Sequence, residues 1–216
     1  MSHVKPNREY SRAEYISDAI VHGIGIGGTL IAGPVLVTLV AVWIGDAGSV
    51  TAAVIYAVTM LAMWICSALY NLVQREDLVP RLRRLDQSAI SLKIAGTYTP
   101  FIALASGSLG FLAGIWAVAL AGATLILVSR RQFSVLTILL YLGLGWAGAV
   151  LGGPLVSTLS PVAFWLLVAG GLTYSAGVVF NVWDSLPFHN TIWHIFVLAG
   201  TGLCYAAIAA EVAFIA

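Results

Sequence analysis

The sequence predicts an all-α integral membrane protein, a bundle of seven transmembrane helices. Of the 216 residues, 60% are hydrophobic and only 9% are charged, whereas average proteins contain about 45–50% apolar and about 25% charged residues. So few charged residues cannot cover the surface of a protein that is dissolved in water. Seven apolar stretches reach the length of about 20 residues that a helix needs to cross the hydrocarbon layer. Helices are expected because a lone strand in lipid would leave its backbone groups unpaired.

The predicted spans follow one another along almost the whole chain. Residues 1–18 form a polar, cytoplasmic amino-terminal segment that contains Lys5, Arg8 and Arg12. The apolar run after it is too long for the core of a signal peptide, so we expect the first helix to stay in the mature protein. Residues 19–216 form the transmembrane domain, with spans at 19–44, 50–72, 88–106, 109–128, 133–151, 162–180 and 191–216.

The distribution of basic residues predicts the orientation of the bundle. Lys and Arg in short loops stay on the cytoplasmic side of a membrane. If the spans alternate, one face holds nine of the ten basic residues, the other face holds none, and Lys93 lies inside the third span. We therefore expect a cytoplasmic amino terminus and an external carboxyl terminus, in a multi-pass protein of the inner (plasma) membrane. A rhodopsin-like receptor has the opposite orientation.

Charge and cysteine content narrow the range of partners. The net charge is +1, and nucleic-acid binding needs clustered basic charge, so membrane lipids are the expected partners and nucleic acid is not. The two cysteines, Cys66 and Cys204, lie in apolar runs and do not form a disulfide framework. In the first span, Gly23, Gly27 and Gly28 have a spacing that lets helices pack closely in lipid.

Ionisable and amide side chains gather at one depth of the predicted bundle. Such residues are costly inside a membrane, which makes their positions informative. Glu14, Asp18 and His22 recur every four residues and so share one face of the first helix. Other polar residues stand at the ends of spans, and these are Asn71, Asp86, Gln87, Asn190 and His194. The topology assigns all of them to the cytoplasmic side, so we expect a single polar site at the inner leaflet.

Each of these residues also has a purely structural interpretation. Glu14 and Asp18 could lie on a solvated face, and Asp86 could be the N-cap of the third helix. Lys93, two turns deeper than Asp86 on the same face, could pair with a carboxylate or extend toward the interface. His22 and His194 could each donate a hydrogen bond to a nearby carbonyl.

His189 is an uncertain partner for His194. The two residues are five apart, so on one helix they point about 140° apart. That geometry is poor for chelation unless His189 belongs to the preceding loop.

Five motifs are spread along these segments, and the first is Glu14-x3-Asp18-x3-His22. The later motifs are residues 67–71 (SALYN), 82–90 (LRRLDQSAI), 94–101 (IAGTYTPF) and 187–200 (PFHNTIWHIFVLAG). Together they resemble the hemolysin III group of the progestin and adipoQ receptor (PAQR) superfamily. Seven spans with a cytoplasmic amino terminus also fit this family.

The resemblance implies a zinc site at the inner leaflet, held by a histidine that ends the second helix and two histidines four residues apart in the seventh, with an aspartate nearby. It also implies metal-assisted hydrolysis of a lipid amide, because the superfamily is similar to alkaline ceramidases. In this chain two of the histidine positions are Asn71 and Asn190, while His194 and Asp86 keep the expected types. An amide is a poor zinc ligand, so the three-histidine site is not present as such.

Two interpretations of the site therefore stay open. In the first, His22, Asp86 and His194 bind the metal, with His189 as a further candidate, and Asp86 is the catalytic residue that orients water. The surrounding hydrogen-bonding groups would be Asn71, Asn190, Ser67, Gln87, Glu14 and Asp18. In the second, the site contains no metal and the same side chains form a hydrogen-bond network.

These interpretations lead to different functions. The first is a divergent zinc-dependent lipid amide hydrolase, and the second is a non-catalytic protein that senses or adjusts the state of the membrane. A cytolysin, which the family name implies, is disfavoured because seven apolar helices cannot stay dissolved in water. A transporter is favoured only by Lys93 and Asp86 in or beside the third span.

Overall fold

The computed structural model describes residues 10–105, 108–129, 134–151 and 153–216. Within these ranges all regular secondary structure is helical, so the predicted all-α class is confirmed. The helices are α1 (Arg12–Trp43), α2 (Ala47–Leu72), α3 (Val79–Leu104), α4 (Leu109–Val128), α5 (Ser134–Leu151), α6 (Gly153–Thr158), α7 (Pro161–Val182) and α8 (His189–Ile215). The predictions that involve Lys5, Arg8, Ser106, Gly107, Arg130, Arg131 and Phe133 lie outside the described residues.

α1 begins seven residues before the predicted first span, because its first turn is capped. The Ser11 side chain accepts a hydrogen bond from the Glu14 amide, and the Glu14 carboxylate accepts one from the Ser11 amide. This reciprocal arrangement satisfies two backbone donors that a helix end otherwise leaves unpaired. The last part of the polar amino-terminal segment is therefore helical.

α3 also begins earlier than its predicted span, at Val79, with Pro80 in its first turn. Proline suits this position because the first amides of a helix have no partner within the helix. Asp86 consequently lies about two turns inside α3, and the N-cap residue is Leu78. The interpretation of Asp86 as an N-cap is therefore wrong. A second difference concerns Gly153, expected in a loop, which begins the six-residue helix α6.

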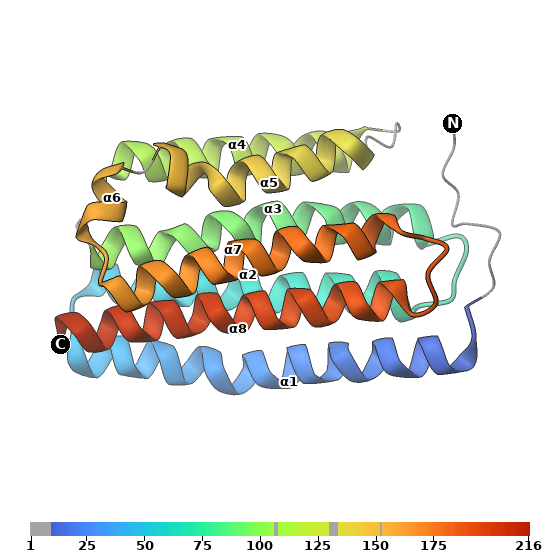
Figure 1. Ribbon diagram of the computed structural model, residues 1–216, viewed down its shortest axis with the longest axis horizontal. Helices are drawn as coiled ribbons and strands as arrows, with labels where there is room; N and C mark the ends of the chain where they lie inside the picture. The colour runs from blue at the N-terminus through green and yellow to red at the C-terminus, as the bar shows by residue number, and fades with distance from the viewer. Residues whose placement is uncertain (1–9, 106–107, 130–133, 152) are drawn as a thin grey trace.

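The long helices run side by side with aligned axes, as Figure 1 shows. α8 packs against both α1 and α7, and α3 packs against α2, α4 and α5. The largest fully buried side chains at the centre are Trp64, Tyr56, Phe101 and Leu36. Outward-facing apolar residues such as Ile31 and Val42 stay exposed, which is the arrangement expected of a bundle surrounded by lipid.

Five of the described helices, α1, α2, α4, α7 and α8, are long and apolar enough to cross a membrane. The fifth helix, α5, carries a shorter apolar stretch, Val135–Leu151. α3 is 26 residues long, but its first turns carry several charged side chains. The chain is thus a membrane protein with several apolar helices.

Close contact between α1 and α2 depends on a glycine that the spacing argument did not select. A Cβ atom on Gly25 would lie 2.5 Å from the ring of Trp64, whereas Gly23, Gly27 and Gly28 have nothing within 4 Å. Helix-packing glycines are recognised by their facing neighbour, which the sequence does not give. The Trp64 ring in turn meets His22 edge-on, with ring centroids 5.8 Å apart, so this contact supports the site described next.

Candidate functional site

Three buried side chains from opposite ends of the chain meet at one end of the bundle. Asp18 and His22 lie one turn apart on α1, and His194 lies on α8. Ligand atoms of the three residues all lie within 4.8 Å of one another. The exposed fractions are 5% for Asp18, 1% for His22 and 4% for His194, so the solvated-face interpretation of Asp18 is wrong.

The ring of His22 is oriented by the backbone of its own helix. Its Nδ1 atom lies 2.8 Å from the carbonyl oxygen of Asp18. Because a carbonyl oxygen can only accept, we assign the proton to Nδ1. The Nε2 atom then carries the lone pair, and it points at the Ser67 hydroxyl, 3.1 Å away.

His194 is oriented in the same sense, but by a carboxylate. Its Nδ1 atom lies 2.6 Å from Oδ1 of Asp18, and its Nε2 atom lies 3.3 Å from the same Ser67 hydroxyl. A carboxylate that holds the Nδ1 proton of a histidine is the usual arrangement behind a metal-ligating Nε2. Both imidazoles therefore direct Nε2 toward one point beside Ser67.

Around the Ser67 hydroxyl there are more hydrogen-bond acceptors than donor protons. The Ser67 hydroxyl has a single proton, yet Nε2 atoms of two histidines approach its oxygen. Asp86, partly buried on α3, adds a carboxylate close enough to His194 and Ser67 to interact with both. Asn71 donates a hydrogen bond to the Ser67 hydroxyl oxygen through Nδ2, at 3.3 Å. A bound cation or an additional proton would compensate for this excess of acceptors around Ser67.

The two asparagines that replace the expected histidines bind each other. The Asn190 amide nitrogen donates to Oδ1 of Asn71 at 3.0 Å and to Oδ2 of Asp18 at 3.2 Å. Asn71 also donates to the backbone carbonyl of Ser67 at 2.9 Å. The amides thus connect α2, α8 and α1 through hydrogen bonds, and they hold Asp18 in place against His194.

Glu14 holds the start of α8 against α1. Its Oε1 atom accepts a hydrogen bond from the amide of Phe188 at 2.9 Å. Phe188 precedes α8 in the left-handed conformation, with φ 59°, which costs a side-chain-bearing residue roughly 1–3 kcal/mol. Glu14 is therefore a buried structural contact between helices, as well as part of the cap of α1.

His189 lies apart from this cluster. It begins α8, its Nε2 atom lies 2.9 Å from the Tyr10 hydroxyl and its Nδ1 atom lies 3.2 Å from the carbonyl of Phe180. Both nitrogens are therefore engaged away from His22 and His194. Nothing in the sequence singled out Tyr10, because a lone tyrosine in a polar segment carries no pattern.

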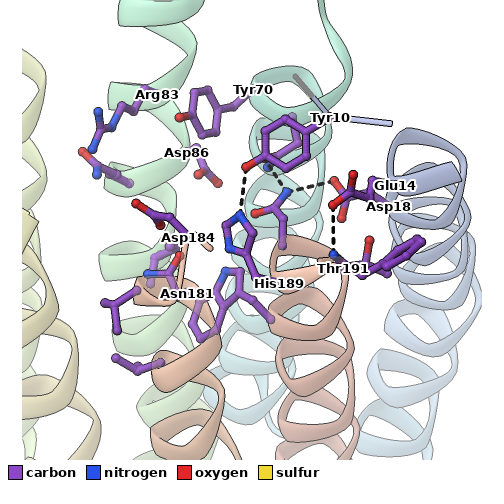
Figure 2. Close-up of a pocket in the computed structure, with 18 of the residues that line it drawn as sticks. Tyr10, Glu14, Asp18, Tyr70, Arg83, Asp86, Asn181, Asp184, His189 and Thr191 are labelled. Carbon is purple, nitrogen blue, oxygen red and sulfur yellow. Dashed lines mark hydrogen bonds between the residues drawn. The ribbon is translucent and has the colours of Figure 1, made fainter. Parts of the chain in front are cut away.

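A cavity of about 360 Å³ opens beside the cluster, and Figure 2 shows its lining. Glu14 and Asp18 on α1 lie across it from Asp86 and Arg83 on α3. Asn71, Asn190 and Gln87 also line it, so the cavity reaches most of the residues that the sequence assigned to the site.

A second cavity, of about 210 Å³, continues into the bundle. Asp86 lines both cavities, while Ser67 and His194 line the second one. Its remaining walls are mostly apolar and come from α2, α3, α5, α7 and α8. The polar cluster therefore stands between a polar opening and an apolar interior, which is suited to a molecule with a polar head and an apolar chain.

Comparison with known proteins places the chain in a family. A family model described as "Haemolysin-III related" matches residues 12–205. The chain belongs to this family. The predicted resemblance to the hemolysin III group and the PAQR superfamily is thereby confirmed.

Named relatives agree with this membership. The chain is 38% identical over 197 residues to "Hemolysin-3 homolog" of Bacillus subtilis (strain 168), covering 89% of this chain and 91% of the relative. It is likewise 38% identical over 197 residues to "Hemolysin-3" of Bacillus cereus, covering 89% of each. The human "Monocyte to macrophage differentiation factor" is 29% identical over 165 residues, covering 71% of this chain and 67% of the relative.

Proposed function

We propose that this haemolysin-III related protein crosses the inner (plasma) membrane seven times, with its amino terminus in the cytoplasm. The proposal adds α3 and α5 to the five spans above, since both run alongside the other long helices (Figure 1). In Figure 1 the start of α1, the connection between α2 and α3 and the start of α3 lie at the same end of the bundle. These segments hold the described Arg residues Arg12, Arg75, Arg81, Arg83 and Arg84, and Arg83 lines the polar cavity at that end. The positive-inside rule makes that end cytoplasmic.

The function that the geometry supports best is metal-assisted hydrolysis of a lipid amide at the inner leaflet. The observation that carries it is the convergence of His22 and His194, each with Nδ1 hydrogen-bonded and Nε2 directed to one point. Two imidazoles and a carboxylate are a ligand set that zinc uses in catalytic sites. The residues that would hold it are His22, His194 and Asp86, with Asp18 orienting His194.

The roles of the remaining groups follow from their positions. Zinc, when bound, supplies a Lewis acid that polarises a carbonyl. Asp86, which borders both cavities, would orient the attacking water against the substrate carbonyl, accept its proton and pass it to the amine that leaves. The apolar cavity would accept the acyl chain, and the polar cavity would accept the head group. Asn71 and Asn190 would keep the ligand-bearing helices in register.

A second candidate is a non-catalytic protein that adjusts the state of the membrane. The observation that favours it is the hydrogen bond between Asn190 and Asn71, because it joins the two positions where the family resemblance implies zinc ligands. In that case the cluster is a metal-free network that fixes the packing of α1, α2 and α8, and one acceptor beside Ser67 carries an additional proton.

Elemental analysis of the purified protein separates these candidates. The hydrolase requires about one zinc per chain, lost in His22→Ala and His194→Ala and retained in His189→Ala, which removes an imidazole outside the cluster. It also requires release of fatty acid from an N-acylated lipid that a chelator stops and that Asp86→Asn abolishes. A metal-free wild type without turnover would refute it. Restoration of normal membrane fluidity in a deletion strain by His194→Ala would support the second candidate.

A further inference from the structure

Asp18, His194 and Ser67 form a continuous line of hydrogen-bonding groups at the centre of the site. Nδ1 of His194 lies 2.6 Å from Oδ1 of Asp18, and Nε2 of the same ring lies 3.3 Å from the Ser67 hydroxyl oxygen. An imidazole that contacts a carboxylate through one nitrogen and a hydroxyl through the other is the arrangement of a nucleophilic triad. The three residues come from α1, α8 and α2, so the sequence contains no local signature of this line.

The two cavities show from which side a substrate reaches these three residues. Ser67 and His194 both border the apolar cavity of about 210 Å³, whereas Asp18 borders the polar cavity of about 360 Å³. The hydroxyl and the imidazole therefore face one space together, and the carboxylate stands behind the ring. The exposed fraction of Ser67 is 7%, so bulk water has little access to the hydroxyl.

His194 is better suited than His22 to act as a base for the Ser67 hydroxyl. Nε2 of His22 also points at this hydroxyl, from 3.1 Å. Its Nδ1 atom, however, is hydrogen-bonded to a neutral backbone carbonyl and lies 3.7 Å from the Asp18 carboxylate, too far for a hydrogen bond. Nδ1 of His194 contacts that carboxylate directly, and a carboxylate in this position stabilises the imidazolium that forms when the ring takes a proton.

We propose that, when no metal occupies the site, Ser67 is the nucleophile of acyl transfer from a lipid ester or amide, with His194 as general base and Asp18 as the residue that positions it. Oγ of Ser67 bonds to the acyl carbonyl carbon while its proton passes to Nε2 of His194. The C–O or C–N bond of the substrate then breaks, and His194 gives the proton to the alcohol or amine that leaves. Water next attacks the acyl-serine and gives a proton to His194, which returns it to Ser67 as the fatty acid leaves.

This activity and the proposed zinc hydrolysis exclude each other, because both use the same lone pair. Zinc on Nε2 of His194 leaves that atom unable to accept the Ser67 proton. Asn71 stands where the family resemblance implies a zinc-ligating histidine, and its Nδ2 atom donates to the Ser67 oxygen at 3.3 Å. The asparagine thus supplies no good metal ligand and adds a donor beside the reacting atoms, where negative charge develops during acyl transfer.

Covalent labelling tests the nucleophile without knowledge of the natural substrate. The full-length protein in nanodiscs is treated with a chelator and then with a long-chain alkyl fluorophosphonate, which loses fluoride when a serine oxygen attacks phosphorus. Mass spectrometry should find about one adduct per chain, on Ser67, and none in Ser67→Ala. His194→Ala should slow labelling by about 100-fold or more, the usual contribution of a general base. Zinc added before the reagent should block labelling.

Two substitutions separate the positioning role of Asp18 from simple packing. Asp18→Asn keeps the size of the side chain but loses its charge, and it should slow labelling by about 100-fold or more. Asp18→Glu keeps the carboxylate and should regain part of the rate. A residue that only fills space would give the opposite order, so faster labelling in Asp18→Asn than in Asp18→Glu would refute the positioning role.

Controls assign the adduct to this site. His189→Ala removes an imidazole outside the cluster and should label at the rate of the wild type. Ser88, a buried serine on α3, should stay unmodified in the same sample. Absence of an adduct on Ser67 in the chelator-treated wild type would overturn the proposal, whether or not the variants fold. Asp86 also interacts with Ser67, so undiminished labelling of His194→Ala would assign the proton to that carboxylate and would likewise overturn it.

Failure of this proposal can be distinguished from failure of the zinc hydrolase. A protein that is purified without metal and is labelled on Ser67 supports acyl transfer and refutes the hydrolase. A zinc-containing protein whose release of fatty acid stops with a chelator, and whose Ser67 then stays unlabelled, supports the hydrolase and refutes acyl transfer by Ser67.

Discussion

The Nδ1 atom of His194 lies 2.6 Å from Oδ1 of Asp18, although 176 residues separate them in the sequence. This contact joins the first and last helices of the bundle. It also fixes the direction of the His194 ring, because the carboxylate accepts a hydrogen bond from Nδ1–H and leaves Nε2 to face Ser67. Fold stability and the chemistry of the site therefore depend on the same pair of atoms.

Replacing Asp18 should damage both properties. In Asp18→Ala the buried imidazole of His194 loses its carboxylate acceptor, and a hydrogen bond to a charged group typically contributes about 1.5–3 kcal/mol. If the site binds zinc, its affinity should fall roughly 10–100-fold. Thermal unfolding in detergent and zinc titration measure the two effects. Asp184→Ala removes an exposed carboxylate at the cavity and is the matched control. Equal melting temperatures for the two variants would contradict this role.

Removal of the Glu14 carboxylate should loosen the start of α8. Glu14→Ala loses hydrogen bonds from the amides of Ser11 and Phe188, each worth about 1.5–3 kcal/mol because the acceptor is charged. Hydrogen exchange should then increase at the beginning of α1 and of α8 together. Glu76→Ala, at an exposed position, should leave exchange unchanged. An increase confined to α1 would argue against the contact with Phe188.

Gly25 and Gly23 form a natural pair for testing helix contact. In Gly25→Ala the new methyl group would overlap the ring of Trp64, and overpacking of this kind typically costs about 1–3 kcal/mol. In Gly23→Ala the methyl group enters open space and should stabilise the helix by roughly 0.5–1 kcal/mol. The difference in melting temperature measures the contact. A smaller loss in Gly25→Ala than in Gly23→Ala would disprove it.

Acid should weaken the start of α2. Asp46 caps this helix by accepting a hydrogen bond from the Ser49 amide at 2.9 Å, and its hydrogen bonds with Ser49 lower the pKa of its carboxyl group below the ordinary value of 3.8. A lowered pKa means that the cap stabilises the fold fully above pH 3.8 and that the contribution disappears as the pH falls through the lower folded value. The Asn side chain of the Asp46→Asn variant can also cap the helix, but it does not titrate. The difference in melting temperature between the wild type and this variant should therefore become smaller as the pH falls below 3.8. A constant difference would contradict the assignment.

Labelling of the two tails tests the topology. A cysteine-reactive, membrane-impermeant reagent should label a cysteine added after Ala216 in intact cells, and should label one added before Ser2 only after lysis. This outcome is expected from the positive-inside rule applied to the described Arg residues at the end of the bundle that holds the polar cavity. Labelling of the amino-terminal tail in intact cells would reverse the orientation and would place the polar cavity outside.

Much of the candidate site could be predicted from the sequence, because residue spacing shows which side chains share one face of a single helix. The four-residue spacing of Glu14, Asp18 and His22 puts them on one face by helix geometry alone, and all three are buried. The α4 bounds match the predicted span 109–128, since Ser108 and Ser129 end an uninterrupted apolar run. The position of His194 along its helix could likewise be predicted, because it lies near the start of the predicted span 191–216.

The sequence by itself determined the helical class, the membrane setting and the grouping of polar residues at one end, because composition and helical period are local properties. Only the tertiary structure decided which partners those residues find. It paired Asp18 with His194, joined Asn71 to Asn190, and left His189 with Tyr10. These contacts depend on the rotation of each helix about its axis, and that rotation is set by packing contacts such as Gly25 against Trp64. No spacing within one helix contains that information.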